Sequence, residues 1–546
     1  LALTQNRKDE AHALATKATT ANPQSASAYS ALSYAEQGRF QLDKAQAAAD
    51  QAAKLAPHDA MVWARKAELE LSQGLTEQSQ KTANKALALD PSLERTQTVT
   101  GFAQLLHMDT DEALQSFQQA VKLDSTAPLP RLGLGLAKIR NGDLEQGRED
   151  LETAAVLDPN NAIVRSYLGK AYYEERRSQL AEDQFNLAKE RDPKDPTPYF
   201  YDAINKQTTN RPVEALHDMQ KAIELNDNRA VYRSSLALDK DAAVRQVGLG
   251  RIFNNLGFDD PANRQAMKSL ALDPSNYSAH RLLSDSYATK PRHEIARASE
   301  HLQSQLLQPL NYNPIQPSLA YTDLNIIRGI GPNETAFNEY NRMFERDGVR
   351  LTATGIAGSN STFGDETALS GIYDKFSFSL GQLHYDTNGF RENNDLKHDI
   401  YNAFAQYEIT PEFNVQAEYR HRETEHGDLE LKGDTNVFDS AYNRKIYQDT
   451  YRLGLKVSPA NHSDFLVSLI HADRTESIDQ GHDGIGNNQG IPFKTDIFVK
   501  TKSYDLETQY LFNSKYINTI AGFGVFHTDN LRITKSTRTE TECPCI

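Results

Sequence analysis

The chain has 546 residues, a formal net charge of −15, 24% charged and 38% hydrophobic residues. This composition excludes a wholly disordered chain, and the acidic balance argues against broad nucleic-acid binding. No run of 18 apolar residues is present, which excludes a membrane-spanning helix. The two cysteines, Cys543 and Cys545, lie near the end of the chain, and the long stretch without cysteine before them suits an oxidising compartment.

Prolines recur at a fixed interval in the first part of the chain. Successive gaps are 34, 34, 68 and 34 residues, Ser125 fills the skipped position, and Asp227 continues the series; the prolines are Pro23, Pro57, Pro91, Pro159 and Pro193. A fixed period of this length indicates a repeat array.

Residues 162–193 illustrate the repeating unit. Leu168 and Gly169 fall in a first predicted helix, and Ala181, Phe185 and Ala188 lie on one face of a second. Small residues stand where two helices must approach closely, and a proline ends the second helix because it lacks an N–H donor. The sequence therefore predicts pairs of packed helices.

This helix–turn–helix pattern, with its spacing of Leu-Gly, Tyr, Ala, Phe, Ala and Pro, resembles the tetratricopeptide repeat. The resemblance covers six repeats from Ala26 to about Arg229, followed by an insertion of about 13 residues and a late helix pair. It implies a superhelical all-α solenoid over residues 1–310, with a protein or polysaccharide partner on its concave face. First-helix positions give the candidate binding residues, which are Lys170, Tyr173, Phe200 and Ile204.

The array begins in the middle of a unit. Ala11, Ala15, Ala18 and Pro23 keep the register of a second helix, while its first helix would lie mostly before Leu1. Since a solenoid needs a terminal cap, we expect the chain to be a fragment of a longer protein.

The pattern changes after a proline-containing linker at residues 311–348. From 349 to 540, apolar and polar residues alternate with a period of two, as in the stretch from Phe413 to Arg420. About nine strands are predicted. Short turns alternate with long polar loops along the chain, which is typical of outer-membrane β-barrels. One polar row is expected to line the lumen: Asn414, Gln416, Glu418, Arg420, Asp505, Glu507 and Gln509.

The stretch from Asn276 to about Leu429 is similar to outer-membrane receptor barrels of the TonB-dependent kind, especially those fused behind tetratricopeptide repeats. Exopolysaccharide-export porins share this order of parts. No plug domain or TonB box is recognisable, which argues against energy-coupled uptake. The resemblance implies an α + β multidomain protein, with the solenoid in the periplasm and a partial antiparallel β-barrel in outer-membrane lipid.

The leading hypothesis is that the solenoid binds a partner or polymer and presents it to the pore. Two alternatives remain open: a surface receptor that uses the long loops, and a soluble adaptor whose second part is a β-sandwich or half-open sheet. An odd number of strands is unusual for bacterial barrels, and the expected C-terminal aromatic is missing after the last strand, so we expect further strands.

Catalytic patterns give no case for an enzyme, and no cofactor or metal is predicted. The stretch His421–His426 brings two histidines and two glutamates together at a strand end, which allows a metal site as the minor alternative, but a hydrated loop is the default interpretation. No Ser–His–Asp arrangement can be argued from order alone.

Overall fold

The structure is a computed structural model of the chain. It describes residues 2–3, 7–39, 41–226, 235–287, 290, 293–310, 346–430, 438–460, 463–482, 493–514 and 517–538. The predicted linker at 311–348 falls outside the described residues up to position 345, as do Asp227 and Arg229.

The N-terminal part consists of successive antiparallel helix pairs. The described residues form seventeen helices before the first strand. They are α1 (Lys8–Ala21), α2 (Ala26–Gly38), α3 (Leu42–Leu55), α4 (Ala60–Ser72), α5 (Thr76–Leu89), α6 (Glu94–His107), α7 (Thr110–Leu123), α8 (Pro128–Arg140), α9 (Leu144–Leu157), α10 (Ala162–Glu174), α11 (Ser178–Arg191), α12 (Pro196–Thr208), α13 (Pro212–Glu224), α14 (Ser235–Asn255), α15 (Asp259–Leu272), α16 (Tyr277–Tyr287) and α17 (Glu294–Leu307).

Helix boundaries follow the sequence signals. Asp59 and Asn161 cap the N-termini of α4 and α10 by accepting hydrogen bonds from backbone N–H groups. Second helices end just before the periodic proline, as α11 does at Arg191, with Asp192 between the helix and Pro193. The prediction of a helical solenoid built from 34-residue units is therefore confirmed.

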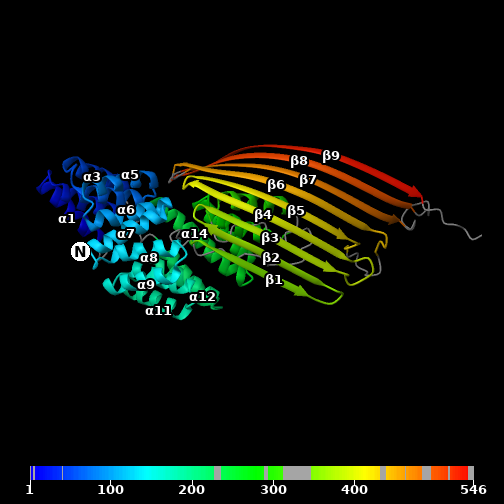
Figure 1. The fold of residues 1–546 in the computed structure, drawn as a ribbon, viewed down its shortest axis with the longest axis horizontal. Coiled ribbons are helices and arrows are strands. Elements are labelled where there is room, and N and C mark those ends of the chain that lie inside the picture. The colour runs from blue at the N-terminus through cyan, green and yellow to red at the C-terminus, as the bar shows by residue number, and fades with distance from the viewer. Residues whose placement is uncertain are drawn as a thin grey trace, which may run out of the picture.

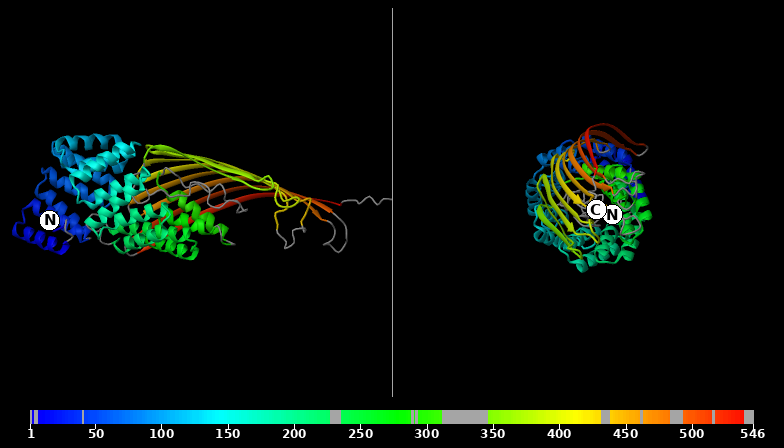
Figure 2. Two further views of the ribbon diagram at one scale, coloured as in Figure 1. Left: turned by 90° about the horizontal axis from the view of Figure 1, so that it is seen from below. Right: turned by 90° about the vertical axis from the view of Figure 1, so that its right-hand side faces the viewer.

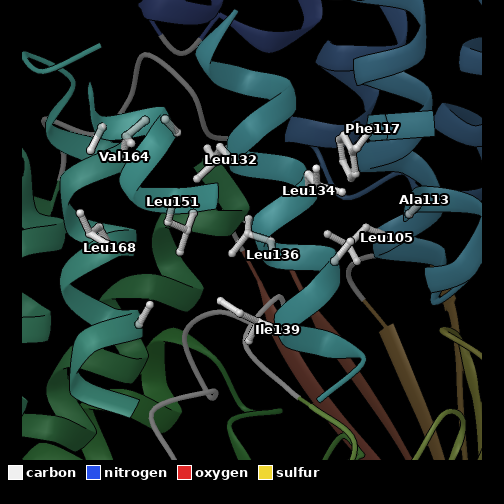
Figure 3. Close-up of a cluster of buried hydrophobic side chains, with 14 residues drawn as sticks. Leu105, Ala113, Phe117, Leu132, Leu134, Leu136, Ile139, Leu151, Val164 and Leu168 are labelled. Carbon is white, nitrogen blue, oxygen red and sulfur yellow. The ribbon is translucent and has the colours of Figure 1, made fainter. Parts of the chain in front are cut away.

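Several apolar clusters fill the space between successive helices of the solenoid. Phe117 on α7 is fully buried, together with Leu105, Leu134 and Leu151 of neighbouring helices (Figure 3). A Cβ atom at Gly133 would lie 2.1 Å from the Phe117 ring. Because no side chain fits there, this glycine lets α8 approach the phenyl ring closely.

The C-terminal part is one antiparallel sheet of nine strands in sequential order. The strands are β1 (Gly348–Ala357), β2 (Phe363–Tyr373), β3 (Phe376–Thr387), β4 (Leu396–Thr410), β5 (Phe413–His426), β6 (Asn443–Ala460), β7 (Ser463–His482), β8 (Phe493–Asn513) and β9 (Asn518–Arg538). Connections of two to four residues after β2, β4, β6 and β8 alternate with longer ones after β1, β3, β5 and β7. Both the strand number and the alternation agree with the sequence prediction.

The sheet is not closed into a barrel, which corrects that part of the predicted fold. In the described residues β1 pairs with β2 and β9 pairs with β8, and the sheet order leaves β1 and β9 as its two edges. Because the strands alternate in direction and nine is odd, β1 and β9 run the same way. Direct closure would therefore need a parallel pair in an otherwise antiparallel sheet.

The solenoid lies at one end of the sheet. Figure 1 shows the strands running away from the helices along the long axis of the molecule, and Figure 2 shows that the sheet is curved. The short connections lie at the end of the sheet next to the solenoid, and we call this end the base. Its contacts with the last helices position the candidate site.

Candidate functional site

One face of the sheet contacts α17, and we call it the inner face; the opposite face is the outer face. Alternation along β5 turns Asn414, Gln416, Glu418 and Arg420 to the inner face, and the register extends the same rows onto β4 and β6. Asp505, Glu507 and Gln509 of β8 lie on this face too, since Gln509 pairs with the inner residue Leu466. The seven predicted lumen residues thus share one face, although that face bounds an open sheet.

Near the base, the inner face caps the C-terminal end of α17. The side-chain amide of Gln416 donates to the carbonyl oxygen of Gln305 at 2.8 Å, and Gln406 donates to that of Gln308 at 3.1 Å. The Lys456 ammonium group lies 3.3 Å from the Leu307 carbonyl oxygen. The last carbonyls of a helix have no intrahelical partner and carry partial negative charge, so amide donors and a cation satisfy them.

A charged network surrounds Glu418 on the inner face. Its carboxylate accepts hydrogen bonds from Arg452 at 3.0 Å, Asn402 at 2.8 Å and Arg420 at 3.3 Å. Gln305 of α17 approaches the same carboxylate at 3.4 Å. A buried carboxylate needs such partners because its desolvation is costly. Glu418 and its two arginines therefore join the helix to the sheet wall.

An apolar cluster completes the contact between α17 and the sheet. Leu306 and Leu307 of the helix are buried against Leu466 of β7 and Leu511 of β8. A Cβ atom at position 454 would lie 2.8 Å from the Leu306 side chain, so Gly454 leaves room for it. Polar and apolar contacts together fix α17 in the base of the inner face.

The rim of the base is anchored on other parts of the solenoid. The Asp347 N–H donates to the Arg140 carbonyl oxygen at 2.9 Å, and Arg346 lies 3.6 Å from Glu174 of α10. At the opposite edge, Asn513 and Asn518 donate to carbonyl oxygens of Leu272 and Ala271, at the end of α15. Contacts at both edges hold the sheet in one orientation on the helices.

Farther from the base, the inner face carries arginines that sequence reasoning missed. Arg444 and Arg474 both donate to Glu476, at 2.7 and 2.8 Å. Arg422 lies in the same cross-strand row as Gln448 and Arg474. The alternation that selected Arg420 also selects these side chains, so extending the two-residue rule to the strand ends would have found them.

The outer face is apolar, and its large side chains are exposed. In the rows between Phe413 and Tyr419 of β5 it presents Leu453 (58% exposed), Tyr451 (51%) and Leu469 (45%).

One row of the outer face crosses five strands with Tyr419, Tyr451, His471, Tyr504 and His527. Ring centroids in this aromatic row are 5.0, 6.2 and 4.4 Å apart from Tyr419 to Tyr504. The next outer row is polar and contains His421, Asp449, Asp473, Lys502 and Asp529.

Of the four residues predicted to bind on the solenoid, two are buried and two are half-buried. Lys170 is completely buried and pairs with Glu174, and Phe200 lies in an apolar cluster with Phe185 and Tyr201. Tyr173 and Ile204 pack partly buried against the same cluster. The repeat register placed these positions on first helices correctly, but packing between neighbouring helices covers two of them.

The metal alternative at 421–426 gains no support from the geometry. His421 lies on the outer face and its Nδ1 is 2.9 Å from an Asp449 carboxylate oxygen. Across the described parts of the chain, no group of three His, Cys, Asp or Glu side chains is arranged to hold a metal ion. None of the described helices is both long and apolar enough to cross a membrane.

Comparison with known proteins gives matches to the solenoid. The tetratricopeptide repeat profile matches residues 132–196, which run from α8 to the start of α12. No curated protein matches the chain.

Solved structures with similar helical folds include the APC/C hetero-tetramer Cut9–Hcn1, at 17% identity and a TM-score of 0.43. That match covers 51% of this chain and 53% of the other, so the chain spans about half the length of this relative. YrrB, described as a TPR protein with an unusual peptide-binding site, matches at 21% identity and a TM-score of 0.25, over 34% of this chain and 95% of YrrB. A thermophilic TPR protein from Thermus thermophilus, TTC0263, matches at 20% identity and a TM-score of 0.32, over 33% of this chain and 98% of that protein.

Tetratricopeptide solenoids present extended surfaces for protein–protein interaction. On the profile match and the sheet order, the chain carries a segment of tetratricopeptide-repeat character within its helical solenoid, followed by a nine-stranded antiparallel sheet.

Proposed function

We propose that the sheet is the wall of an outer-membrane pore, that its outer face contacts lipid, and that the solenoid lies in the periplasm. In this function the solenoid binds a protein partner or a polysaccharide and presents it to the inner face for export or transport. The role is that of a scaffold and conduit, without catalysis or a cofactor.

The polarity of the sheet carries this proposal. Apolar outer residues such as Leu453 and Tyr451 are exposed, whereas the polar inner residues Asn414 and Gln416 are 6% and 4% exposed. In water, exposed apolar area costs about 25 cal/mol per Å², so a soluble sheet would turn these side chains inward. In lipid the same arrangement is favourable, because apolar-out and polar-in strands are what a bilayer requires.

The aromatic row and its neighbours support an orientation in the membrane. Tyrosines prefer the membrane–water interface because their rings are apolar and their hydroxyls polar. On β6 the outer face has four successive residues from Tyr451 to Val457. At 3.3 Å per residue, the apolar stretch between these two ends is about 20 Å long. A charged row lies just beyond the aromatic one. We therefore place the aromatic row at the lipid boundary on the side of the long loops.

The solenoid lies at the base of the sheet, next to the short connections. Outer-membrane barrels have short turns on the periplasmic side and long loops outside. The contacts of Arg140, Leu272 and Gln305 with the base agree with a periplasmic solenoid that feeds the inner face directly.

Fractionation of cells that express the full chain tests the proposal. We expect the protein in the outer-membrane fraction, resistant to carbonate extraction, and heat-modifiable on gels in detergent. Recovery in the soluble fraction would favour the soluble adaptor. Conductance across planar bilayers, blocked by an added sugar polymer, would separate the conduit from a surface receptor that uses only its long loops.

A further inference from the structure

The C-terminal end of α17 lies across the base of the inner face. Side chains of β4, β5 and β6 reach carbonyl oxygens at this helix end, from Gln406, Gln416 and Lys456. Its leucines pack against Leu466 of β7 and Leu511 of β8. The helix end therefore contacts five successive strands of the nine in the sheet.

Burial on the inner face coincides with this helix end. Residues 304–308 are each at most 3% exposed. In one cross-strand row near the base, Gln416 and Ser468 are 4% and 1% exposed. Glu507 and Gly524 continue the same row on β8 and β9, and both are exposed. A molecule that moves from the solenoid onto the inner face at β5 to β7 would therefore meet α17.

Withdrawal of α17 from the sheet leaves the Glu418 network paired. Three partners of the Glu418 carboxylate belong to the sheet itself, namely Asn402, Arg420 and Arg452. The helix approaches the same carboxylate through Gln305, at the longer distance of 3.4 Å. Breaking a buried ion pair is costly because it leaves a buried charge without a partner. Here the ion pairs stay within β5 and β6, so the helix can leave without that cost.

The contacts that hold α17 on the sheet are of a kind that water can replace. Water can take the place of the side-chain donors at the carbonyl oxygens of Gln305, Leu307 and Gln308, as at any exposed helix end. Four leucines form the buried apolar cluster between helix and sheet, whereas fourteen buried residues form the cluster around Phe117. Segments with fewer buried apolar contacts open at lower free energy than the core. The contact is therefore suited to open while the solenoid stays folded.

We infer that α17 is a gate, which closes the base of the inner face in this structure and must withdraw from the sheet before a polymer passes. The inference rests on the proposed function, because it assigns a regulation to the same path. A ligand shifts an equilibrium only through its different affinity for the two states. The cargo or partner that opens the gate therefore binds more tightly to the chain with α17 withdrawn.

Two leucine variants in one cross-strand row test whether the helix can be displaced. Gly454 and Gly524 both lie in the row of Gln416. A Cβ atom at 454 would lie 2.8 Å from Leu306, whereas the nearest atom to a Cβ at 524 is in the Glu507 side chain, 3.6 Å away. We expect amide hydrogen exchange at residues 304–308 of the full-length protein to accelerate at least tenfold in G454L and less than twofold in G524L. Equal exchange in the two variants would contradict a displaceable helix.

Conductance of the same proteins across planar bilayers tests whether displacement opens a path. We expect G454L to raise the mean conductance at least fivefold over the unaltered protein and G524L to stay within twofold of it. Faster exchange in G454L without a rise in conductance would overturn the gate, because α17 would then only anchor the sheet.

A reversible crosslink closes the gate in a second design. In a chain whose own cysteines are replaced, C543S/C545S, the pair Q305C/Q416C places one thiol on the helix and one on the strand beneath it. Because Q416C removes the donor to the Gln305 carbonyl oxygen, the unlinked protein should conduct more than its C543S/C545S parent. A short bis-methanethiosulfonate linker should return conductance to the parent level or below, and reduction should restore it. The single variants Q305C and Q416C take up the reagent without bridging and should stay open or unchanged. Conductance that ignores the linker would refute the gate.

The proposed function and the gate fail in different ways. A membrane-bound protein that conducts equally in its unaltered, G454L and crosslinked forms refutes the gate alone. A protein that conducts in none of these forms refutes the pore, and the gate with it.

Discussion

The side-chain amide of Gln416 donates a 2.8 Å hydrogen bond to the backbone carbonyl oxygen of Gln305, which lies 111 residues earlier in the chain. The acceptor is at the C-terminal end of α17, where helix carbonyls lack partners within the helix. A strand of the sheet therefore supplies the cap that the helix cannot supply itself. The two parts of the chain are consequently coupled through a defined contact, in addition to their covalent connection.

Replacement of Gln416 by alanine should weaken this coupling. The variant loses the bond to Gln305 and leaves the guanidinium of Arg452 without the Gln416 oxygen, 3.3 Å away. Loss of a buried hydrogen-bond partner costs about 1–3 kcal/mol. We expect the free energy of unfolding in denaturant to fall by this amount and protease cleavage near α17 to accelerate. The control Q382A changes an outer-face glutamine and should leave both unchanged; an equal effect in the two variants would refute a specific cap.

An arginine at position 453 distinguishes lipid from water around the outer face. Leu453 lies in the middle of the apolar rows and is well exposed. If lipid surrounds it, L453R should cost about 2–4 kcal/mol and reduce the amount of heat-modifiable protein in membranes. The matched variant L180R changes an exposed leucine on α11 and should alter stability by less than about 0.5 kcal/mol. A neutral L453R would contradict membrane insertion.

Local periodicity was sufficient to predict the elements of both parts. Ala181, Phe185 and Ala188 lie along one face of a helix and are all completely buried. Their spacing places the apolar residues on a single side of the helix, and the neighbouring helices pack against that side. The two-residue alternation from Phe413 likewise gave the correct faces of β5. In both cases the period of the apolar residues in the sequence determines which face of the element they share.

Contacts between distant segments were beyond such reasoning. The carbonyl oxygen of Gln305 is a backbone acceptor, so no residue type signals that it will be capped by β5. The burial of Lys170 was missed for a related reason. Its ion-pair partner Glu174 lies one helical turn away and is visible in the sequence, but the repeat spacing does not show which other segments cover the lysine. Closure of the sheet is also non-local, since it depends on whether the edges β1 and β9 meet.

Truncation of Phe117 tests how the solenoid core is held together. The ring is completely buried and fills the space over Gly101 and Gly133. Replacement of a buried phenylalanine by alanine costs about 3–5 kcal/mol, because it leaves a cavity. We expect F117A to lower the melting temperature of the helical signal, whereas Q118A, at an exposed position on the same helix, should not. A small effect of F117A would mean that the neighbouring helices collapse onto the cavity.

Protonation of His301 should loosen the contact between α17 and the sheet. Burial, with the nearby charges of Arg281 and Arg420, lowers the pKa of this histidine well below its ordinary value of about 6.5. The folded protein therefore keeps His301 neutral, while the unfolded chain takes up a proton as the pH falls through about 6.5.

The sign of the effect follows from this difference in proton binding. Stability is fully present above about pH 6.5 and declines on acidification toward the folded-state pKa, by up to about 1.4 kcal/mol per pH unit from this group. Denaturant unfolding between pH 7.5 and 5 should show a shallower decline in H301Q than in the unaltered protein. H12Q changes a histidine at the far end of the solenoid, beside Glu36, and should retain the steeper decline. Parallel curves for H301Q and the unaltered protein would show that His301 titrates alike in the folded and unfolded chain, so that its burial does not control the contact.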